Sequence, residues 1–263
     1  MEESKAGGRI CVSSVTLRTF PDATRLAEAA ASAFLTAMAG ASGASSAQHV
    51  AVSGGRIARA FFETVALLSR DKGMEWNGTH FHWADERCVP PEHPESNYAL
   101  AHESLFSRIH IQPDQVHRIR GEEPPEVAAR QAAETLARWV PKNSQGQPSL
   151  DLVILGMGED GHVASLFPGG LPPDQADPSY RAVVGPKPPP NRVTLTYPAL
   201  LAANRVWVLA SGAGKAEALR TSLTKGGTPP LGWVLANREE TLVFSDIPGV
   251  EPSLEEGHAS GAR

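Results

Sequence analysis

Short apolar runs that end in glycine or serine recur along this chain, and each is followed by residues with helical spacing. Three such runs are residues 50–52, 152–155 and 206–210, which lead into Ser53-Gly54-Gly55, Gly156 and Ser211-Gly212. Runs that are apolar on both sides, with helices between them, are typical of parallel strands buried beneath crossover helices. The pattern predicts an α/β protein with an open, mostly parallel, Rossmann-like sheet and helices on both faces.

The rest of the chain fits the same alternation. Further strands are predicted at residues 8–15, 80–84, 193–196, 233–236 and 242–244, and further helices are predicted to begin near Asp22, Ser96 and Pro125. The proline-rich range 168–190 predicts a long surface loop without regular structure. No shift in composition marks a second domain, so residues 1–263 are expected to form one domain with flexible ends at about 1–7 and 252–263.

Charge and composition narrow the class of protein. The chain has 24 Lys and Arg against 29 Asp and Glu, a formal charge of −5, and no basic stripe, which disfavours nucleic-acid binding. Its two cysteines cannot form a disulfide framework. Its first residues lack the basic segment followed by an apolar segment that is typical of a signal peptide, and no apolar stretch is long enough to span a bilayer. A cytoplasmic protein without a membrane partner is expected, as a monomer or small homo-oligomer.

Polar residues follow several predicted strands, and the carboxyl ends of such strands are where ligands bind in open α/β sheets. Glycines let the backbone approach an anion closely, and helix N-termini present free N–H groups to it. The pattern indicates a phosphate on a small molecule, although each turn taken singly is better explained by helix capping. These turns are Ser53-Gly54-Gly55-Arg56, Asp85-Glu86-Arg87, the range from Gly158 through Asp160 and Gly161 to His162, and the range 211–215, which ends at Lys215.

The range 156–161 also matches G-x-G-x-x-G directly after a predicted strand, so dinucleotide binding must be considered. That motif should open a long helix, but Pro168 stops the helix within two turns. The second strand with its acidic end would fall in the proline-rich range. We therefore do not predict NAD binding.

His162, with Asp160 two residues before it, is a candidate general base, since an imidazole beside a carboxylate can take a proton near neutral pH. The alternative is a surface or structural histidine. Arg87 can hold a phosphate or carboxylate through two parallel hydrogen bonds, or pair with its acidic neighbours. No G-x-S-x-G elbow and no metal-ligand spacing occurs. The predicted chemistry is non-covalent, without a metal or cofactor.

Four blocks, spread over nearly the whole chain, resemble the 6-phosphogluconolactonases. They are VAVSGG (50–55), WADERCVPPEHPESNY (83–98), LDLVILGMGEDGHVASLFPG (150–169) and RVTLTYPALLAANRVWVLASGAGKA (192–216). The resemblance implies a Rossmann-like fold shared with the glucosamine-6-phosphate deaminases. It also implies hydrolysis of 6-phospho-D-glucono-1,5-lactone to 6-phosphogluconate in the oxidative pentose phosphate pathway, without a required cofactor.

The resemblance also implies roles for single residues. His162 would activate water for attack on the lactone carbonyl, Asp160 would orient or polarise His162, and Arg87 would help position the substrate or stabilise negative charge. The 6-phosphate would be held by Lys215 and Arg192, together with the amides of Ser53, Gly54 and Gly55. One departure is Arg56, which stands where the family usually has Ser or Thr. Asp85, Glu86, Gly158 and Gly161 complete the expected substrate-binding set.

Two alternatives remain open. In the sister deaminase and isomerase activity, a catalytic carboxylate lies five positions after the histidine, where this chain has Phe167, and a tyrosine takes the place of Arg87. Both differences favour the lactonase. A non-catalytic sugar-phosphate-binding regulator on the same fold would require the loss of His162 or its partners, which are present.

Overall fold

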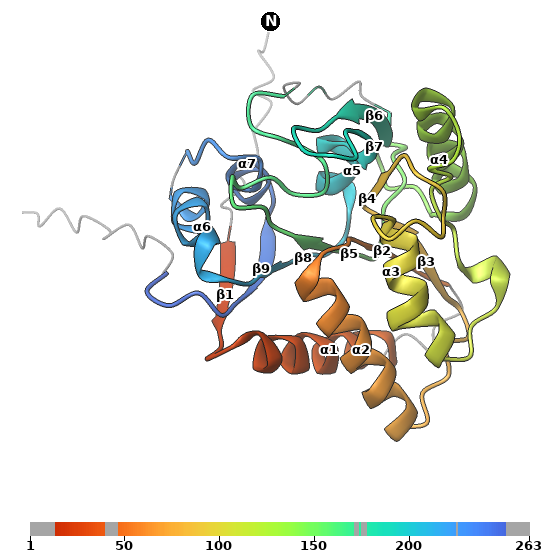
Figure 1. The fold of residues 1–263 in the computed structure, drawn as a ribbon, viewed down its shortest axis with the longest axis horizontal. Coiled ribbons are helices and arrows are strands. Elements are labelled where there is room, and N and C mark those ends of the chain that lie inside the picture. Colours follow the sequence, from red (N-terminus) through yellow and green to blue (C-terminus); the bar gives the residue numbers. More distant parts are fainter. Residues whose placement is uncertain (1–13, 40–46, 171–173, 175–177, 225, 251–263) are drawn as a thin grey trace, which may run out of the picture.

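The computed structural model describes residues 14–39, 47–170, 174, 178–224 and 226–250. A six-stranded sheet runs through the middle of the molecule, and all of its pairings are parallel (Figure 1). The predicted parallel α/β sheet is therefore confirmed. In order across the sheet, the strands are β1 (Ser14–Thr19), β9 (Glu240–Ser245), β8 (Val206–Ala210), β5 (Leu152–Gly156), β2 (Gln48–Val52) and β3 (Thr79–Trp83).

Helices cover both faces of this sheet, as expected. Helices α1 (Ala23–Ala39) and α2 (Arg56–Asp71) lie on one face, and α5 (Tyr197–Ala202) and α7 (Pro230–Ala236) lie on the other (Figure 1). The remaining helices are α3 (Asn97–Ser104), α4 (Pro125–Trp139) and α6 (Ala216–Leu223). In the described part of the chain, no helix is long and apolar enough to cross a membrane.

Two of the predicted strands need correction. The strand predicted at 233–236 is wrong, because these residues belong to helix α7. Their short apolar run fits either element, and Pro230 at the first helical turn favours the helix. The strand predicted at 8–15 begins at Ser14 and continues to Thr19, while residues 8–13, like the termini predicted to be flexible, lie outside the described residues.

A second, antiparallel sheet has the order β4 (Asp85–Arg87), β7 (Asn191–Leu195), β6 (Tyr180–Val184). It corrects the prediction that 168–190 lacks regular structure, since β6 lies within that range. The prolines at 178 and 186 flank β6 and do not interrupt it, and an edge strand tolerates them there. Strand β4 begins two residues after β3, so this small sheet is anchored directly to the parallel one.

Candidate active site

A cleft of about 640 Å³ opens where strands β2, β5 and β8 end, because the residues that follow each strand line it. Carboxyl ends of parallel strands share one edge of a sheet, which brings distant segments together. Glu86, Asp160 and Gly161 do not line the cleft. All the other predicted site residues do: Ser53, Gly54, Gly55, Arg56, Asp85, Arg87, Gly158, His162, Arg192 and Lys215.

A tight turn after β5 carries His162 to the cleft. The Gly158 N–H donates to the His162 carbonyl at 2.9 Å, and the Gly161 N–H donates to the Gly158 carbonyl at 3.1 Å. Gly161 has a φ of +79°, in the left-handed region that favours glycine, and a Cβ there would lie 2.5 Å from Pro229 Cβ. Gly161 is thus needed for the turn although it does not line the cleft.

The His162 imidazole is paired with Asp160. Nδ1 of His162 lies 2.6 Å from Asp160 Oδ1, which also accepts the His162 backbone N–H at 3.2 Å. A carboxylate only accepts, so Nδ1 carries the proton and Nε2 keeps its lone pair. Burial acts to raise the pKa of Asp160, but the hydrogen bonds from His162 outweigh it and hold that pKa below its usual value. The pair can act as a base at Nε2.

Gly158 makes room for this pair. A Cβ at position 158 would lie 2.1 Å from Nδ1 of His162 and 2.6 Å from Oδ1 of Asp160. Real Cβ contacts are never that short, so any other residue would push the imidazole and the carboxylate aside.

Two arginines lie side by side on the antiparallel sheet, where Arg87 of β4 is the register partner of Arg192 of β7. Arg87 donates from Nη1 to the carbonyl of Glu95 at 2.5 Å and to its carboxylate at 3.3 Å. Arg192 is 7% exposed and donates to the carbonyls of Pro189 and Lys187 at 3.2 and 3.3 Å. Burial, reinforced by Arg87, lowers the pKa of Arg192. Its hydrogen-bond partners are neutral carbonyls, and the nearby carboxylates of Asp85, Glu95 and Glu86 act to keep it charged.

Asp85 is buried, and its carboxylate accepts the Ser165 hydroxyl at 2.7 Å. The Asn97 amide donates to the Asp85 carbonyl at 2.8 Å and to its carboxylate at 3.3 Å. Asn97 also lines the cleft and lies against Gly54, where a Cβ would lie 1.9 Å from Asn97 Oδ1. Asn97 was not predicted from its residue pattern as a site residue, although it lies at the start of the helix predicted near Ser96.

Glu86 lies beneath the cleft. Its buried carboxylate accepts the backbone N–H groups of Arg87, Asn97 and Tyr98 at 2.7 to 2.8 Å and the Ser96 hydroxyl at 3.1 Å. Burial raises the pKa of Glu86 to about 7, against the effect of these hydrogen bonds. Glu86 therefore caps α3 and ties it to β4.

A second cationic region lies at the N-terminus of α2. Gly55, with a φ of +102°, precedes the first helical residue, Arg56, and the buried hydroxyl of Ser53 has no hydrogen-bond partner among the described residues. Burial lowers the pKa of Lys215, and the nearby Arg56 lowers it further. Two cations and a helix N-terminus at one end of the cleft can bind an anion.

Lys187 also lines the cleft and was not among the predicted site residues. It lies in the proline-rich connection between β6 and β7, where no strand end or glycine turn indicates a site. Within the described ranges, no group of three or more His, Cys, Asp or Glu side chains is arranged to hold a metal ion. The described groups that can act chemically are a carboxylate-oriented imidazole and several cations.

Comparisons with known proteins identify the family to which the chain belongs. Residues 21–243 match the family described as glucosamine-6-phosphate isomerases/6-phosphogluconolactonase. The chain is 40% identical over 211 residues to 6-phosphogluconolactonase 3, chloroplastic, of Arabidopsis thaliana, covering 76% of this chain and 63% of that protein. It is 35% identical over 213 residues to 6-phosphogluconolactonase of Streptomyces coelicolor, covering 78% and 82%.

A solved structure, that of 6-phosphogluconolactonase from Thermotoga maritima, superposes with a TM-score of 0.73 at 27% identity, covering 88% of this chain and 99% of that one. The family match extends over most of the chain, and the matched range contains all the cleft residues described above. The chain therefore belongs to the family of glucosamine-6-phosphate isomerases and 6-phosphogluconolactonases.

Proposed function

We propose that this chain hydrolyses 6-phospho-D-glucono-1,5-lactone to 6-phospho-D-gluconate, with His162 as the general base. The observation that carries the proposal is the 2.6 Å pairing of His162 with Asp160 beside a cleft rich in arginine and lysine. Relatives that bear the name 6-phosphogluconolactonase support the choice of substrate.

The reaction needs one water and one base. Nε2 of His162 takes a proton from water as the water oxygen attacks the lactone carbonyl, and Asp160 stabilises the imidazolium that forms. The tetrahedral oxyanion then expels the ring oxygen, which receives the proton back from His162, and the carboxylic acid that forms loses its remaining proton to solvent to give the product carboxylate. General-base assistance is worth about 10²–10⁴-fold, which suffices for an ester already activated by its ring.

The cations of the cleft have separate tasks in this proposal. Lys215, Arg192 and the turn at 53–55 hold the 6-phosphate, a part of the substrate that does not react and that supplies orientation. Arg87 lies beside Arg192 and stabilises the charge that develops on the carbonyl oxygen. No step in this scheme requires a cofactor.

The proposal also covers the setting of the protein. We keep the expectation of a cytoplasmic monomer or small homo-oligomer that acts on a small molecule, without nucleic acid or membrane. Light scattering of the purified chain tests the oligomeric state, and the net charge of −5 supports the absence of a nucleic-acid partner.

Initial-rate hydrolysis of freshly generated 6-phosphogluconolactone tests the activity, with ammonia release from glucosamine-6-phosphate assayed in parallel. We expect lactone hydrolysis well above the spontaneous rate and no ammonia. Ammonia release would assign the sister activity. If neither activity is detected, the non-catalytic sugar-phosphate-binding protein becomes the favoured alternative.

A further inference from the structure

The side chain of Phe167 contacts both the candidate base and an anion-binding arginine. Its ring centroid lies 4.9 Å from that of His162, with an angle of 50° between the planes. On the same ring, the guanidinium carbon of Arg192 lies 5.7 Å from the centroid, within the range of a cation–π interaction. One flat side chain thus touches two groups that arrive from different strands.

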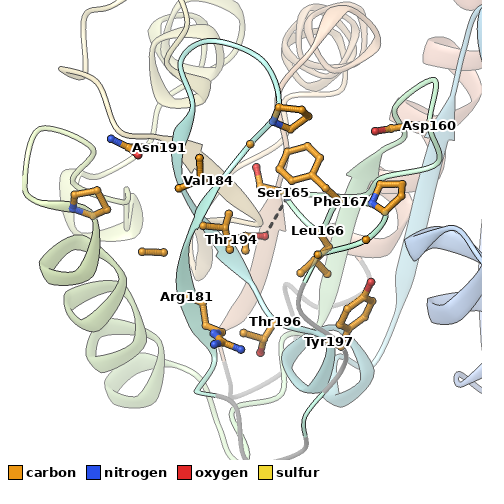
Figure 2. Close-up of a pocket in the computed structure, with 18 of the residues that line it drawn as sticks. Asp160, Ser165, Leu166, Phe167, Arg181, Val184, Asn191, Thr194, Thr196 and Tyr197 are labelled. Atoms are coloured by element: carbon orange, nitrogen blue, oxygen red, sulfur yellow. Dashed lines mark hydrogen bonds between the residues drawn. The ribbon is translucent and has the colours of Figure 1, made fainter.

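Phe167 lies next to the cleft but lines a second cavity. His162 and Arg192 line the cleft of about 640 Å³, whereas Phe167 lines a second, neighbouring cavity of about 870 Å³. Figure 2 shows this second cavity, with Phe167 at its upper end and Arg181, Thr196 and Tyr197 at its lower end. Phe167 thus lines the second cavity while its ring packs on two residues that line the cleft.

The fold keeps a place for this ring. A Cβ at position 185 would lie 3.1 Å from Cε2 and Cζ of Phe167 and 2.9 Å from Nε of Arg192. Glycine at 185 therefore leaves the space in which the ring and the guanidinium meet. The backbone of Phe167 is also held, because its carbonyl accepts the Gly170 N–H at 3.1 Å and this hydrogen bond closes the turn that carries the side chain.

The contacts of the two partners explain what the ring adds. Asp160 orients His162 through Nδ1, on one edge of the imidazole. Arg192 is held by two carbonyls and has no carboxylate partner among the described residues. An aromatic face restrains the imidazole and the guanidinium without occupying Nε2 of His162 or pairing with the charge of Arg192, so both groups remain available to a substrate.

We propose that Phe167 is a positioning residue that fixes the His162 imidazole and the Arg192 guanidinium relative to each other, so that base and anion-binding charge meet one substrate. The kinetic part of this inference rests on the proposed function. A displacement of about 1 Å in a catalytic group can reduce the rate about 10²-fold. Loss of the ring that contacts both His162 and Arg192 should therefore have a measurable effect on the rate.

The kinetic test compares Phe167→Ala and Phe167→Leu with the control Leu166→Ala. Leu166 lies on the same loop and lines the same second cavity, but it has no aromatic ring to pack on His162 or Arg192 as Phe167 does. We expect Phe167→Ala to lower kcat about tenfold or more and to raise KM a few-fold. Phe167→Leu keeps apolar bulk but loses the aromatic face, so kcat should recover in part while KM stays raised.

Leu166→Ala should leave kcat and KM within twofold of the unmodified chain, even if its melting temperature falls. If Phe167→Ala also stays within twofold once corrected for folded protein, the proposal is overturned. Equal losses of kcat in the Phe167→Ala and Leu166→Ala variants would overturn it as well, since they would indicate general loosening of the loop.

A second measurement does not depend on activity. In the NMR spectrum of the imidazole Cε1–H groups, the His162 signal is identified by its absence in His162→Ala. Loss of the neighbouring ring current should shift this signal in Phe167→Ala but not in Leu166→Ala. If the unmodified chain hydrolyses no lactone, the proposed function fails while this measurement still decides the inference, and an unchanged His162 signal would refute it.

Discussion

A single carboxylate oxygen, Oδ1 of Asp160, accepts hydrogen bonds from both the ring and the backbone of His162, at 2.6 and 3.2 Å. The ring nitrogen and the turn are therefore fixed by the same atom. This arrangement sets the proton-bearing nitrogen and the ring orientation together, as a general base requires. Two substitutions separate the contributions of the base and its partner.

His162→Ala should lower kcat for lactone hydrolysis about 10²–10⁴-fold, because the proton acceptor is lost. Binding of 6-phosphogluconate, measured by calorimetry, should change little, since the phosphate contacts lie elsewhere in the cleft. Asp160→Asn should show a smaller loss of kcat, because the imidazole remains but its tautomer is no longer fixed. Near-wild-type turnover in His162→Ala would remove this residue from the mechanism.

Gly158→Ala should reduce kcat at least about tenfold, because its Cβ would displace both His162 and Asp160. The matched control is Gly156→Ala, two residues earlier, whose Cβ would meet only the Gly54 carbonyl at an ordinary 3.6 Å. Comparison of kcat and melting temperature for the two variants checks this. Equal kcat values would show that the space above Gly158 has no bearing on catalysis.

Lys215→Met should weaken binding of 6-phosphogluconate at least about tenfold, because a charge-assisted contact to phosphate is worth about 1.5–3 kcal/mol. Burial lowers the pKa of Lys215, so its positive charge is lost at lower pH than that of an ordinary lysine. In the unmodified chain, affinity should therefore fall as pH rises through the alkaline range, and this fall should be absent in Lys215→Met. Calorimetry at several pH values checks both points, with the exposed Lys142→Met as control. If Lys142→Met weakens binding equally, the effect is one of overall charge.

The sequence predicted most of the parallel sheet and most of the cleft for the same physical reason. Strands buried on both faces are nearly continuous apolar runs, and their carboxyl ends must meet at one edge. Residues on the turns that follow such runs, such as Ser53 and His162, could therefore be assigned to one edge of the sheet before the order of the strands was known. This reasoning depends only on local pattern and on the geometry of parallel strands.

The antiparallel sheet could not be predicted in that way. Strand β4 consists of Asp85, Glu86 and Arg87, residue types that seldom form strands, and it is held by β7, about a hundred residues later. Lys187 reaches the cleft only through that pairing. The helix at 230–236 was not predicted because the run of four residues at 233–236 is too short to show whether its apolar residues follow a helical or a strand period.

Four histidines cluster away from the cleft. His49 and His80 are register partners on β2 and β3, His49 Nδ1 lies 3.2 Å from His82 Nε2, and His80 Nδ1 lies 2.9 Å from His117 Nε2. Trp139 packs against His80 and His117, and the acidic groups that act on the cluster are Asp151, on His49, and Asp114, on His80 and His117. Burial, reinforced by neighbouring imidazoles, lowers the pKa of His49 and of His117 to about 4.

This cluster predicts a loss of stability in acid. A histidine with a lowered pKa in the folded chain binds fewer protons than in the unfolded chain, so its contribution is present above about pH 6.5 and is lost as pH falls toward 4. Between pH 7.5 and 5, His49 and His117 should each lower the free energy of unfolding, by at most about 2 kcal/mol because solvent screens these partly buried groups. Urea unfolding at both pH values checks this, and His117→Gln should reduce the difference by about the contribution of one group. The control is His102→Gln, an exposed histidine outside the cluster, which should leave the difference unchanged. Equal acid sensitivity in the unmodified chain and His117→Gln would show that the cluster is not its source.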